Sequence, residues 1–317
     1  MSATEEIHLD VDDIHKHYGG IKALSGATVM VKKNQLTSLI GPNGSGKTTL
    51  FNVITGWVFK TDPRDEEDVE PTDEDHQDGF FNRIIRSSLK ELNMFRQSFL
   101  KELNKIKQRF EREAETDQKD DIGHVIFEDM RLDGLEAHEI GVIGLMRTFQ
   151  TTRNWQKLTV LENLLVAPHN QTGDSFLNIF FKQKQIQEEE RRNTLKALEI
   201  LDFLEISQIR DQIASELSGG QLKLLAVGRL LMTVPRLLLL DEPMAGINPT
   251  LGNKIMDKIV ELKKDATIFL IEHNMDVVFN YSDEIFVMAR GQIIAQGTPD
   301  EIEKNKEVIE AYLGADY

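Results

Sequence analysis

The chain has 317 residues, which is enough for one large α/β domain or for two modest domains with an ample core. Its 53 acidic residues outnumber the 37 basic ones and give a net charge of -16, which disfavours a nucleic-acid partner. Because the chain has no cysteine, disulfides, thiolate metal sites and cysteine nucleophiles are excluded.

The first 60 residues predict strands followed by a helix, with a phosphate-binding loop between the last strand and that helix. Residues 1–13 are polar and acidic, so we expect no secretory signal peptide. Residues 35–40 are expected to form a buried strand that leads into the loop, and 47–56 are expected to be helical. The connecting loop and helix start read Gly41, Pro42, Asn43, Gly44, Ser45, Gly46, Lys47, Thr48 and Thr49. Glycines let backbone N–H groups approach phosphate oxygens, while the lysine supplies a cation and the first threonine a magnesium-binding hydroxyl.

The segment from 61 to 120 interrupts this pattern. Residues 61–79 contain ten acidic residues and one basic residue, a composition typical of a solvated, disordered linker. Residues 80–110 carry eight basic residues and apolar side chains at steps of three and four, which predicts a basic amphipathic helix. That helix either packs on its own domain, with its charge balanced by the acidic run, or docks on an acidic partner or an anionic membrane surface.

From residue 123 onward strands and helices alternate, which is typical of a parallel sheet. The expected strands are 124–127, 145–149, 236–241, 267–272, 284–288 and 292–295. The expected helical stretches are 135–141, about 160–215, about 250–264 and 300–312. The unbroken apolar runs at 236–241 and 267–272 predict fully buried central strands. No apolar run reaches the roughly 20 residues that a membrane-spanning helix needs, so any membrane association is expected to be peripheral.

Two of the buried strands end in residues suited to phosphate chemistry. Asp241 is expected to emerge at the carboxyl edge of the sheet, next to the phosphate loop, where its carboxylate could hold magnesium. Glu242 would then act as a general base on the attacking water. His273 follows the next buried strand, although a lone histidine at such a place is usually structural.

Five blocks, in their order and spacing, resemble the nucleotide-binding domain of an ABC transporter. They are Gly41–Thr49, Phe149-Gln150, Leu217-Ser218-Gly219-Gly220-Gln221, Leu237–Pro243 and Ile271-Glu272-His273. The block at 217–221 discriminates most strongly, because ordinary phosphate-loop ATPases lack it. The resemblance implies an ABC-type P-loop ATPase fold: a mainly parallel central sheet, an antiparallel β subdomain, an α-helical signature subdomain and, in this chain, an inserted amphipathic helical segment.

The domain boundaries expected from this resemblance divide the chain into three parts. Residues 1–60 and 121–297 would form the nucleotide-binding domain, with the helical subdomain at about 150–233. The insertion would occupy 61–120, and 298–317 would be a C-terminal helical tail.

The resemblance also implies ATP and Mg²⁺ as ligands and assigns roles to individual residues. Tyr18 would stack on adenine, and residues 41–49 would bind the phosphates. Ser218, Gly219, Gly220 and Gln221 would bind the γ-phosphate of the ATP held by a second subunit, so dimerisation would be part of the mechanism. Thr48, Gln150 and Asp241 would hold magnesium, and the catalytic residues would be Glu242, His273 and Gln150. Asn248 departs from the aspartate that is commonest at its position, which puts the cross-interface contact there in doubt.

Finer details are similar to the ATP-binding subunits of branched-chain amino acid transporters. They lie at 141–150, 158–167, 245–249 and 297–314. The implied partners are transmembrane permease subunits, a second ATP-binding subunit of the same or a sister type and, indirectly, a solute-binding protein. These partners place the chain at the cytoplasmic face of the membrane, held there through the permease. The alternatives are the ATPase of a urea or short-amide importer, that of a lipopolysaccharide exporter, and a non-transport ATPase of the chromosome-maintenance and repair type.

Overall fold

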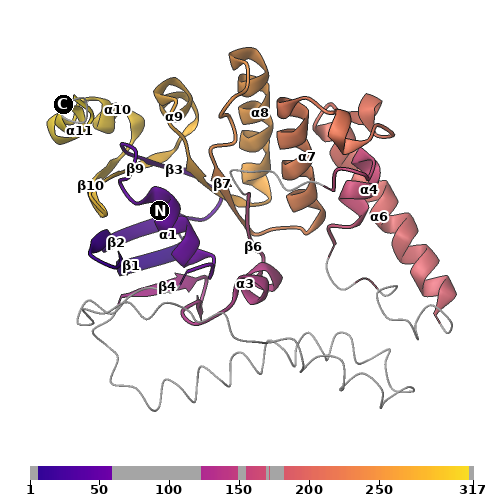
Figure 1. The fold of residues 1–317 in the computed structure, drawn as a ribbon, viewed down its shortest axis with the longest axis horizontal. Helices are drawn as coiled ribbons and strands as arrows, with labels where there is room; N and C mark the ends of the chain where they lie inside the picture. Colours follow the sequence, from indigo (N-terminus) through magenta and orange to yellow (C-terminus); the bar gives the residue numbers. More distant parts are fainter. Residues whose placement is uncertain (1–5, 59–122, 149–154, 169–170, 172–181, 314–317) are drawn as a thin grey trace, which may run out of the picture. The chain divides into compact units, whose positions relative to one another are not determined.

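The computed structural model describes residues 6–58, 123–148, 155–168, 171 and 182–313 (Figure 1). They belong to one compact unit, formed by Met1–Pro63 and Gly123–Tyr317. The insertion expected at 61–120, the last four residues of the tail and Gln150 lie outside the described residues.

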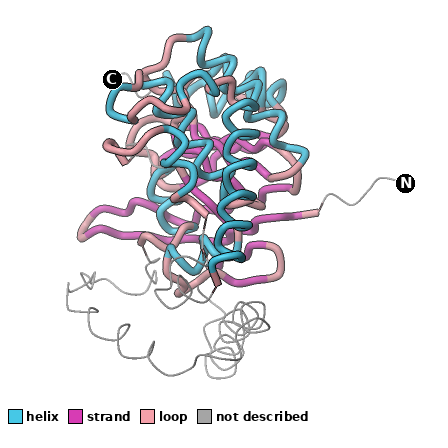
Figure 2. The backbone as a smooth tube through the Cα atoms, turned by 90° about the vertical axis from the view of Figure 1, so that its right-hand side faces the viewer, coloured by secondary structure: helices cyan, strands magenta, loops and turns pink. Residues whose placement is uncertain are grey.

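A four-stranded antiparallel sheet has the order β2-β1-β4-β5. Its strands are β1 (Ile7–Tyr18), β2 (Ile21–Lys32), β4 (His124–Phe127) and β5 (Met130–Arg131). Apolar side chains that alternate along β1 and β2 are buried, which is the pattern of a sheet with one face toward a core. Since β1 pairs with β4, chain segments on either side of the insertion meet in one sheet. Figure 2 shows these strands crossing the lower part of the view, below most of the helices.

The second sheet has six strands in the order β10-β9-β3-β8-β7-β6. They are β3 (Leu36–Ile40), β6 (Leu145–Arg147), β7 (Leu237–Asp241), β8 (Thr267–Ile271), β9 (Glu284–Ala289) and β10 (Gln292–Gly297). All neighbouring pairs are parallel except β9 and β10. Every residue of β3, β7 and β8 is buried, which confirms the expectation that these three are buried strands.

Helices cover both faces of this sheet. They are α1 (Lys47–Ile54), α3 (Ala137–Ile143), α4 (Val160–Leu165), α6 (Gln183–Phe203), α7 (Gly219–Met232), α8 (Pro249–Glu261), α9 (Met275–Tyr281), α10 (Pro299–Glu303) and α11 (Lys306–Leu313). Successive residues of β8 point to opposite faces. Phe269 packs on Phe51 of α1, with the two ring centroids 4.9 Å apart. Ile268 and Leu270 instead share a core with α4, α6, α7 and α8.

The structure corrects the expected ends of several elements. The first helix ends at Ile54 rather than at residue 56, and α3 begins and ends two residues later than expected. Arg236 precedes β7 rather than belonging to it. The single helix expected at 300–312 is wrong, since two helices, α10 and α11, replace it. The break has a physical cause: the side-chain oxygen of Asn305 accepts hydrogen bonds from the backbone N–H groups of Glu307 and Val308 and so starts a new helix.

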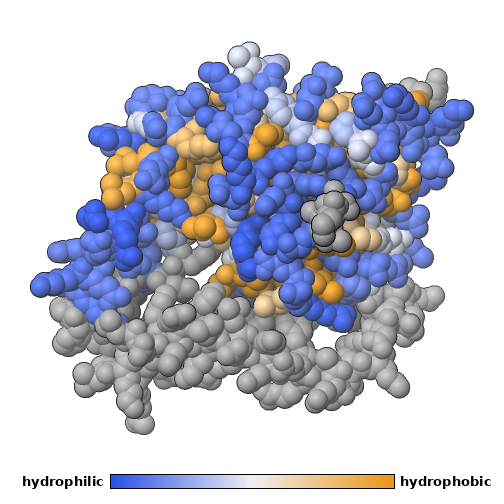
Figure 3. Space-filling view, turned by 180° about the vertical axis from the view of Figure 1, so that it is seen from behind, coloured by the Kyte–Doolittle hydropathy of each residue, from blue (hydrophilic) through white to orange (hydrophobic). Residues whose placement is uncertain are grey.

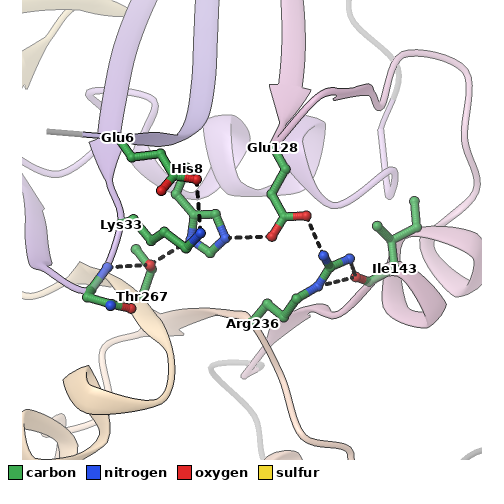
Figure 4. A network of polar contacts seen from close by, with 8 residues as sticks. Glu6, His8, Lys33, Glu128, Ile143, Arg236 and Thr267 are labelled. Atoms are coloured by element: carbon green, nitrogen blue, oxygen red, sulfur yellow. Dashed lines mark hydrogen bonds and ion pairs between the residues drawn. The ribbon is translucent and has the colours of Figure 1, made fainter. Parts of the chain in front are cut away.

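A network of polar side chains joins the two sheets at the start of β1 (Figure 4). His8 is buried, with its Nε2 3.1 Å from a Glu128 oxygen and its Nδ1 2.6 Å from the Thr267 hydroxyl at the start of β8. A second Glu128 oxygen accepts from Arg236, whose guanidinium also donates to the carbonyl of Ile143. Because the carboxylate can only accept, Nε2 of His8 carries a proton and Nδ1 accepts from Thr267.

The surface seen from behind is mainly hydrophilic, with apolar side chains in separate patches (Figure 3). Among the described helices, none has both the length and the apolar character that crossing a membrane requires.

Candidate functional site

Three neighbouring strands of the six-stranded sheet bring the predicted site together. β3, β8 and β7 lie side by side and run parallel, so their carboxyl ends meet at one edge of the sheet. The glycine-rich loop follows β3, Asp241 is the last residue of β7 and is followed by Glu242, and His273 comes two residues after β8. In open α/β sheets this edge is where ligands bind.

The glycine-rich loop has a shape that only glycine allows at two points. Gly41 has φ 154°, and a Cβ there would lie 2.0 Å from the carbonyl oxygen of Met288. Gly46, the residue before α1, has φ 107°, and a Cβ there would lie 2.6 Å from the carbonyl oxygen of Ala23. A backbone hydrogen bond from Gly291, in the turn between β9 and β10, to Ser45 further fixes the loop.

Lys47 is the cation of this loop. Its Nζ donates to the backbone carbonyls of Gly41 and Pro42, each at 2.9 Å. Burial lowers the pKa of Lys47, while the negative charges of Glu242 and Asp241 oppose that shift. The ammonium is therefore held by backbone carbonyls of the loop itself. Thr48, the next residue, is exposed at the start of α1.

Asp241 is buried, and only one of its two carboxylate oxygens has a hydrogen-bond partner among the described residues. Its Oδ2 lies 2.7 Å from Nη2 of Arg147, and the two side chains are 1% and 5% exposed. Its backbone N–H donates to the hydroxyl of Thr148. Its other oxygen, Oδ1, is buried and has no hydrogen-bond partner among the described residues. A buried carboxylate oxygen without a partner is costly, which suits a ligand bound at that atom.

Glu242 and His273, two of the predicted catalytic residues, are in direct contact. Nε2 of His273 lies 2.7 Å from Oε1 of Glu242, and since the carboxylate can only accept, the ring donates from this nitrogen. Glu242 has φ 49°, a left-handed conformation that is uncommon outside glycine. The side chain of Glu242 is 15% exposed and that of His273 is 42% exposed, so both remain accessible to water and ligand.

The residues of the 217–221 block lie at the start of α7, away from the glycine-rich loop. Ser218 caps this helix, accepting from the N–H of Gln221, whose side chain accepts from the N–H of Ser218 in return. Gly219 is exposed, while Gly220 packs so closely that a Cβ would lie 2.4 Å from the side chain of Leu251. In Figure 1, β7 and α8 lie between α1 and α7, so the structure does not bring this block to the glycine-rich loop.

Two other predicted residues have defined places. Tyr18 ends β1 with its side chain 45% exposed, and the Nζ of Lys16 lies 5.0 Å from the centre of its ring. Asn248 caps α8, its side-chain oxygen accepting from the N–H groups of Thr250 and Leu251. Asparagine and aspartate cap helices equally well, so the cap of α8 is kept although Asn248 replaces the aspartate that is commonest at this position.

The sequence reasoning missed Arg147, which connects three elements at the site. Besides Asp241, its guanidinium donates to the side chain of Asn52 on α1 at 2.6 Å and lies 5.5 Å from the centre of the Phe51 ring. It also missed Asn163, whose buried amide bonds four backbone groups of residues 155–159, the stretch just after Gln150. Both residues stand within blocks that resembled a known family, but nothing in their spacing indicates what they contact.

The family comparison covers most of the chain. The family model described as "ABC transporter" matches residues 24–144 and 123–245. A second model, described as "Branched-chain amino acid ATP-binding cassette transporter", matches residues 292–317.

Individual relatives agree with these models. The chain is 38% identical to a probable branched-chain amino acid transport ATP-binding protein of Methanocaldococcus jannaschii, over 99% of this chain and 100% of that protein. It is 30% identical to the high-affinity branched-chain amino acid transport ATP-binding protein of Escherichia coli K12, over 96% of this chain and 97% of that protein. Among solved structures, an ATP-binding cassette of an ABC transporter in its ADP conformation has a TM-score of 0.67 and 36% identity, covering 98% of this chain and 100% of that chain.

Proposed function

The chain belongs to the ABC transporter family as an ATP-hydrolysing subunit, and we propose that it energises the uptake of branched-chain amino acids or related small polar solutes. The observation that carries the catalytic part is the 2.7 Å pair of Glu242 and His273 at the edge where the glycine-rich loop also lies. The names of the relatives support the solute class.

The glycine-rich loop and Lys47 would hold the phosphates of ATP. The backbone N–H groups of the loop and the start of α1 favour anions. Lys47 now donates to two backbone carbonyls, which phosphate oxygens would replace as acceptors. Tyr18, exposed at the end of β1, would stack on the adenine ring.

The donor set beside the loop fits Mg²⁺. This ion prefers hard oxygen ligands, and Oδ1 of Asp241 is a buried carboxylate oxygen with no hydrogen-bond partner among the described residues. The hydroxyl of Thr48 would be a second ligand, and Gln150, which lies outside the described residues, a third. When bound, the ion would neutralise charge on the transferring phosphoryl group.

Glu242 would act as the general base and His273 would position it. The carboxylate of Glu242 would accept a proton from the water that attacks the γ-phosphate. The N–H of the His273 ring, which donates to Oε1, would hold this carboxylate in place, and the ring would give up this bond to sense the γ-phosphate. Loss of either side chain should therefore lower the rate of hydrolysis strongly and change the affinity for ATP much less.

A second ATP-binding subunit would complete each site. Ser218 caps α7, and Gly219, Gly220 and Gln221 form its first turn; Ser218 and Gly219 are exposed, and a helix N-terminus favours an anion. Since α8 and β7 separate α7 from the glycine-rich loop of the same chain, these residues would meet the γ-phosphate held by a partner chain. Closure of the two subunits would then drive a conformational change in permease subunits, which the ATPase would contact at the cytoplasmic face of the membrane. A solute-binding protein would deliver the solute to these permease subunits.

Uptake measurements in the source cell test the proposed solute. Deleting the gene for this chain should abolish high-affinity uptake of labelled leucine, isoleucine and valine, and the wild-type gene should restore it. A gene carrying Lys47→Ala should not restore uptake, although the protein should be made in equal amount. Unchanged uptake of all three amino acids, with loss of urea or amide uptake or of lipopolysaccharide export instead, would contradict the proposal and favour the corresponding alternative.

A further inference from the structure

Lys223, in the second turn of α7, donates two hydrogen bonds to the backbone turn that begins with Glu242. Its Nζ lies 2.9 Å from the carbonyl oxygen of Glu242 and 2.6 Å from that of Ala245. An ammonium group donates to both oxygens at once. Lys223 is only partly exposed, and burial lowers its pKa, while the charges of Glu272 and Glu242 oppose that shift.

Glu272, the residue after β8, bonds the same turn. Its Oε1 accepts from the backbone N–H of Met244 at 2.8 Å, and its Oε2 accepts from the backbone N–H of His273 at 3.2 Å. The residue is 4% exposed, so these bonds are shielded from water. One carboxylate therefore connects the turn after β7 to the histidine after β8.

The turn needs such support because of its backbone conformation. Glu242 is in the left-handed region, which is unfavourable for a residue with a side chain and persists only where its surroundings enforce it. Hydrogen bonds that involve a charged group are stronger than neutral ones, and here two charged groups act on one short turn. Burial raises the pKa of Glu272, while its bonds from the N–H groups of Met244 and His273 and the positive charge of Lys223 oppose that shift.

We propose that Lys223 and Glu272 are positioning residues that together hold the turn 242–245, so that the Glu242 carboxylate meets the His273 ring in the reactive arrangement. The proposal rests on the proposed function of Glu242 as the base. Neither residue is in contact with the glycine-rich loop through any hydrogen bond that the described residues show, so their effect should be on the chemical step rather than on ATP binding.

The variant Lys223→Met tests the proposal, with Lys196→Met as a matched control. Lys196 is also a half-buried lysine that donates to a carbonyl of α7, that of Met232 at 2.9 Å, but it lies away from the turn. Misplacing a reacting group by about 1 Å can slow a reaction by about 100-fold. We expect Lys223→Met to lower kcat by about 10- to 100-fold with KM and the Kd for ATP changed less than about twofold. Lys196→Met should leave kcat within about twofold, and Lys223→Arg, which keeps the donors, should recover most of the rate.

A double variant with Glu242→Gln distinguishes a positioning role of Lys223 from a merely structural one. If Lys223 acts through Glu242, adding Lys223→Met to Glu242→Gln should cause no further loss of turnover. Should Lys223→Met fail to fold, Glu272→Gln carries the same test, because its amide can accept from only one of the two N–H groups and should lower kcat alone. The proposal is overturned if either folded variant keeps wild-type kcat, or if the loss appears in the Kd for ATP rather than in kcat. If Glu242→Gln itself keeps full turnover, the proposed base is wrong, and that outcome is distinct from a failure of the two positioning residues.

Discussion

Nη2 of Arg147 lies 2.7 Å from Oδ2 of Asp241, while Oδ1 of the same carboxylate has no hydrogen-bond partner among the described residues. The pair thus fixes the carboxylate from one side and leaves Oδ1 for the Mg²⁺ ion that we propose to bind there. Both side chains are almost fully buried, so each charge depends on the other for compensation.

Replacing Arg147 with Met should destabilise the protein strongly, because the carboxylate of Asp241 would remain buried without its partner. Breaking a buried ion pair by removing one member costs about 3–5 kcal/mol. The free energy of unfolding, measured by urea denaturation, should fall by that amount. Arg191→Met is the control, since Arg191 pairs with Glu188 on the exposed surface of α6 and should have little effect. Equal stability of the two variants would show that the buried pair does not have this role.

Replacing Gly41 with Ala should be more damaging than replacing Gly44 with Ala. Both glycines have positive φ, so both variants place a side chain on a backbone conformation that favours glycine. A Cβ at Gly41 would lie 2.0 Å from the carbonyl oxygen of Met288, whereas a Cβ at Gly44 would meet nothing within 4 Å. We expect Gly41→Ala to lose about 1–3 kcal/mol more stability, measured by thermal or urea unfolding. If Gly44→Ala unfolded at a lower denaturant concentration than Gly41→Ala, the close contact at Gly41 would not be what makes a side chain there destabilising.

Part of the fold and of the candidate site follows from the sequence alone. Unbroken apolar runs gave the central strands β7 and β8, because a strand buried on both faces must be apolar throughout. The motif blocks placed the glycine-rich loop, Glu242 and His273 at one sheet edge, since parallel strands share the edge at which they end. The partner of Asp241 could not be predicted, because Arg147 is 94 residues away and its contact depends on how β6 and β7 pair.

The C-terminal region shows the same limit on a local scale. The apolar spacing of residues 300–312 fits one helix, but the side chain of Asn305 competes for backbone N–H groups and ends the pattern. Such a cap depends on the backbone conformation at one residue, which periodicity does not report.

Val234→Asn should stabilise the protein. Val234 has φ 54° and is 70% exposed, an unfavourable conformation for a β-branched residue with few contacts to lose. Asn tolerates the left-handed region, so the variant should gain about 0.5–1 kcal/mol in the free energy of unfolding. Val166→Asn is the control, because Val166 is 50% exposed but has an ordinary φ of -80°. A gain of the same size at Val166 would exclude backbone strain as the reason.

The stability of the protein should fall as the pH drops through the range in which His8 would normally take up a proton. Burial lowers the pKa of His8, although the nearby carboxylate of Glu128 opposes that shift. The unfolded chain takes up this proton near pH 6.5, whereas the folded chain resists it. The contribution of His8 is therefore complete above about pH 6.5 and declines as the pH falls toward the lowered pKa.

His8→Gln should reduce this pH dependence. The slope of unfolding free energy against pH between about 5 and 6.5 should be smaller than in the wild type. His138→Gln, at a histidine whose side chain is 74% exposed, should leave the slope unchanged. An unchanged slope in His8→Gln would contradict the assignment of a neutral, buried His8.

The central claim is that two copies of this ATPase fold close on ATP, each completing the other's site, and that Glu242 then drives hydrolysis. The most direct measurement is the molar mass of Glu242→Gln in solution by light scattering, with and without Mg²⁺ and ATP, beside its rate of phosphate release. The account predicts a dimer only when ATP is present, unimpaired ATP binding and a turnover reduced by at least about 100-fold. A protein that binds ATP but stays monomeric, or one that still hydrolyses it at the wild-type rate, would contradict the account.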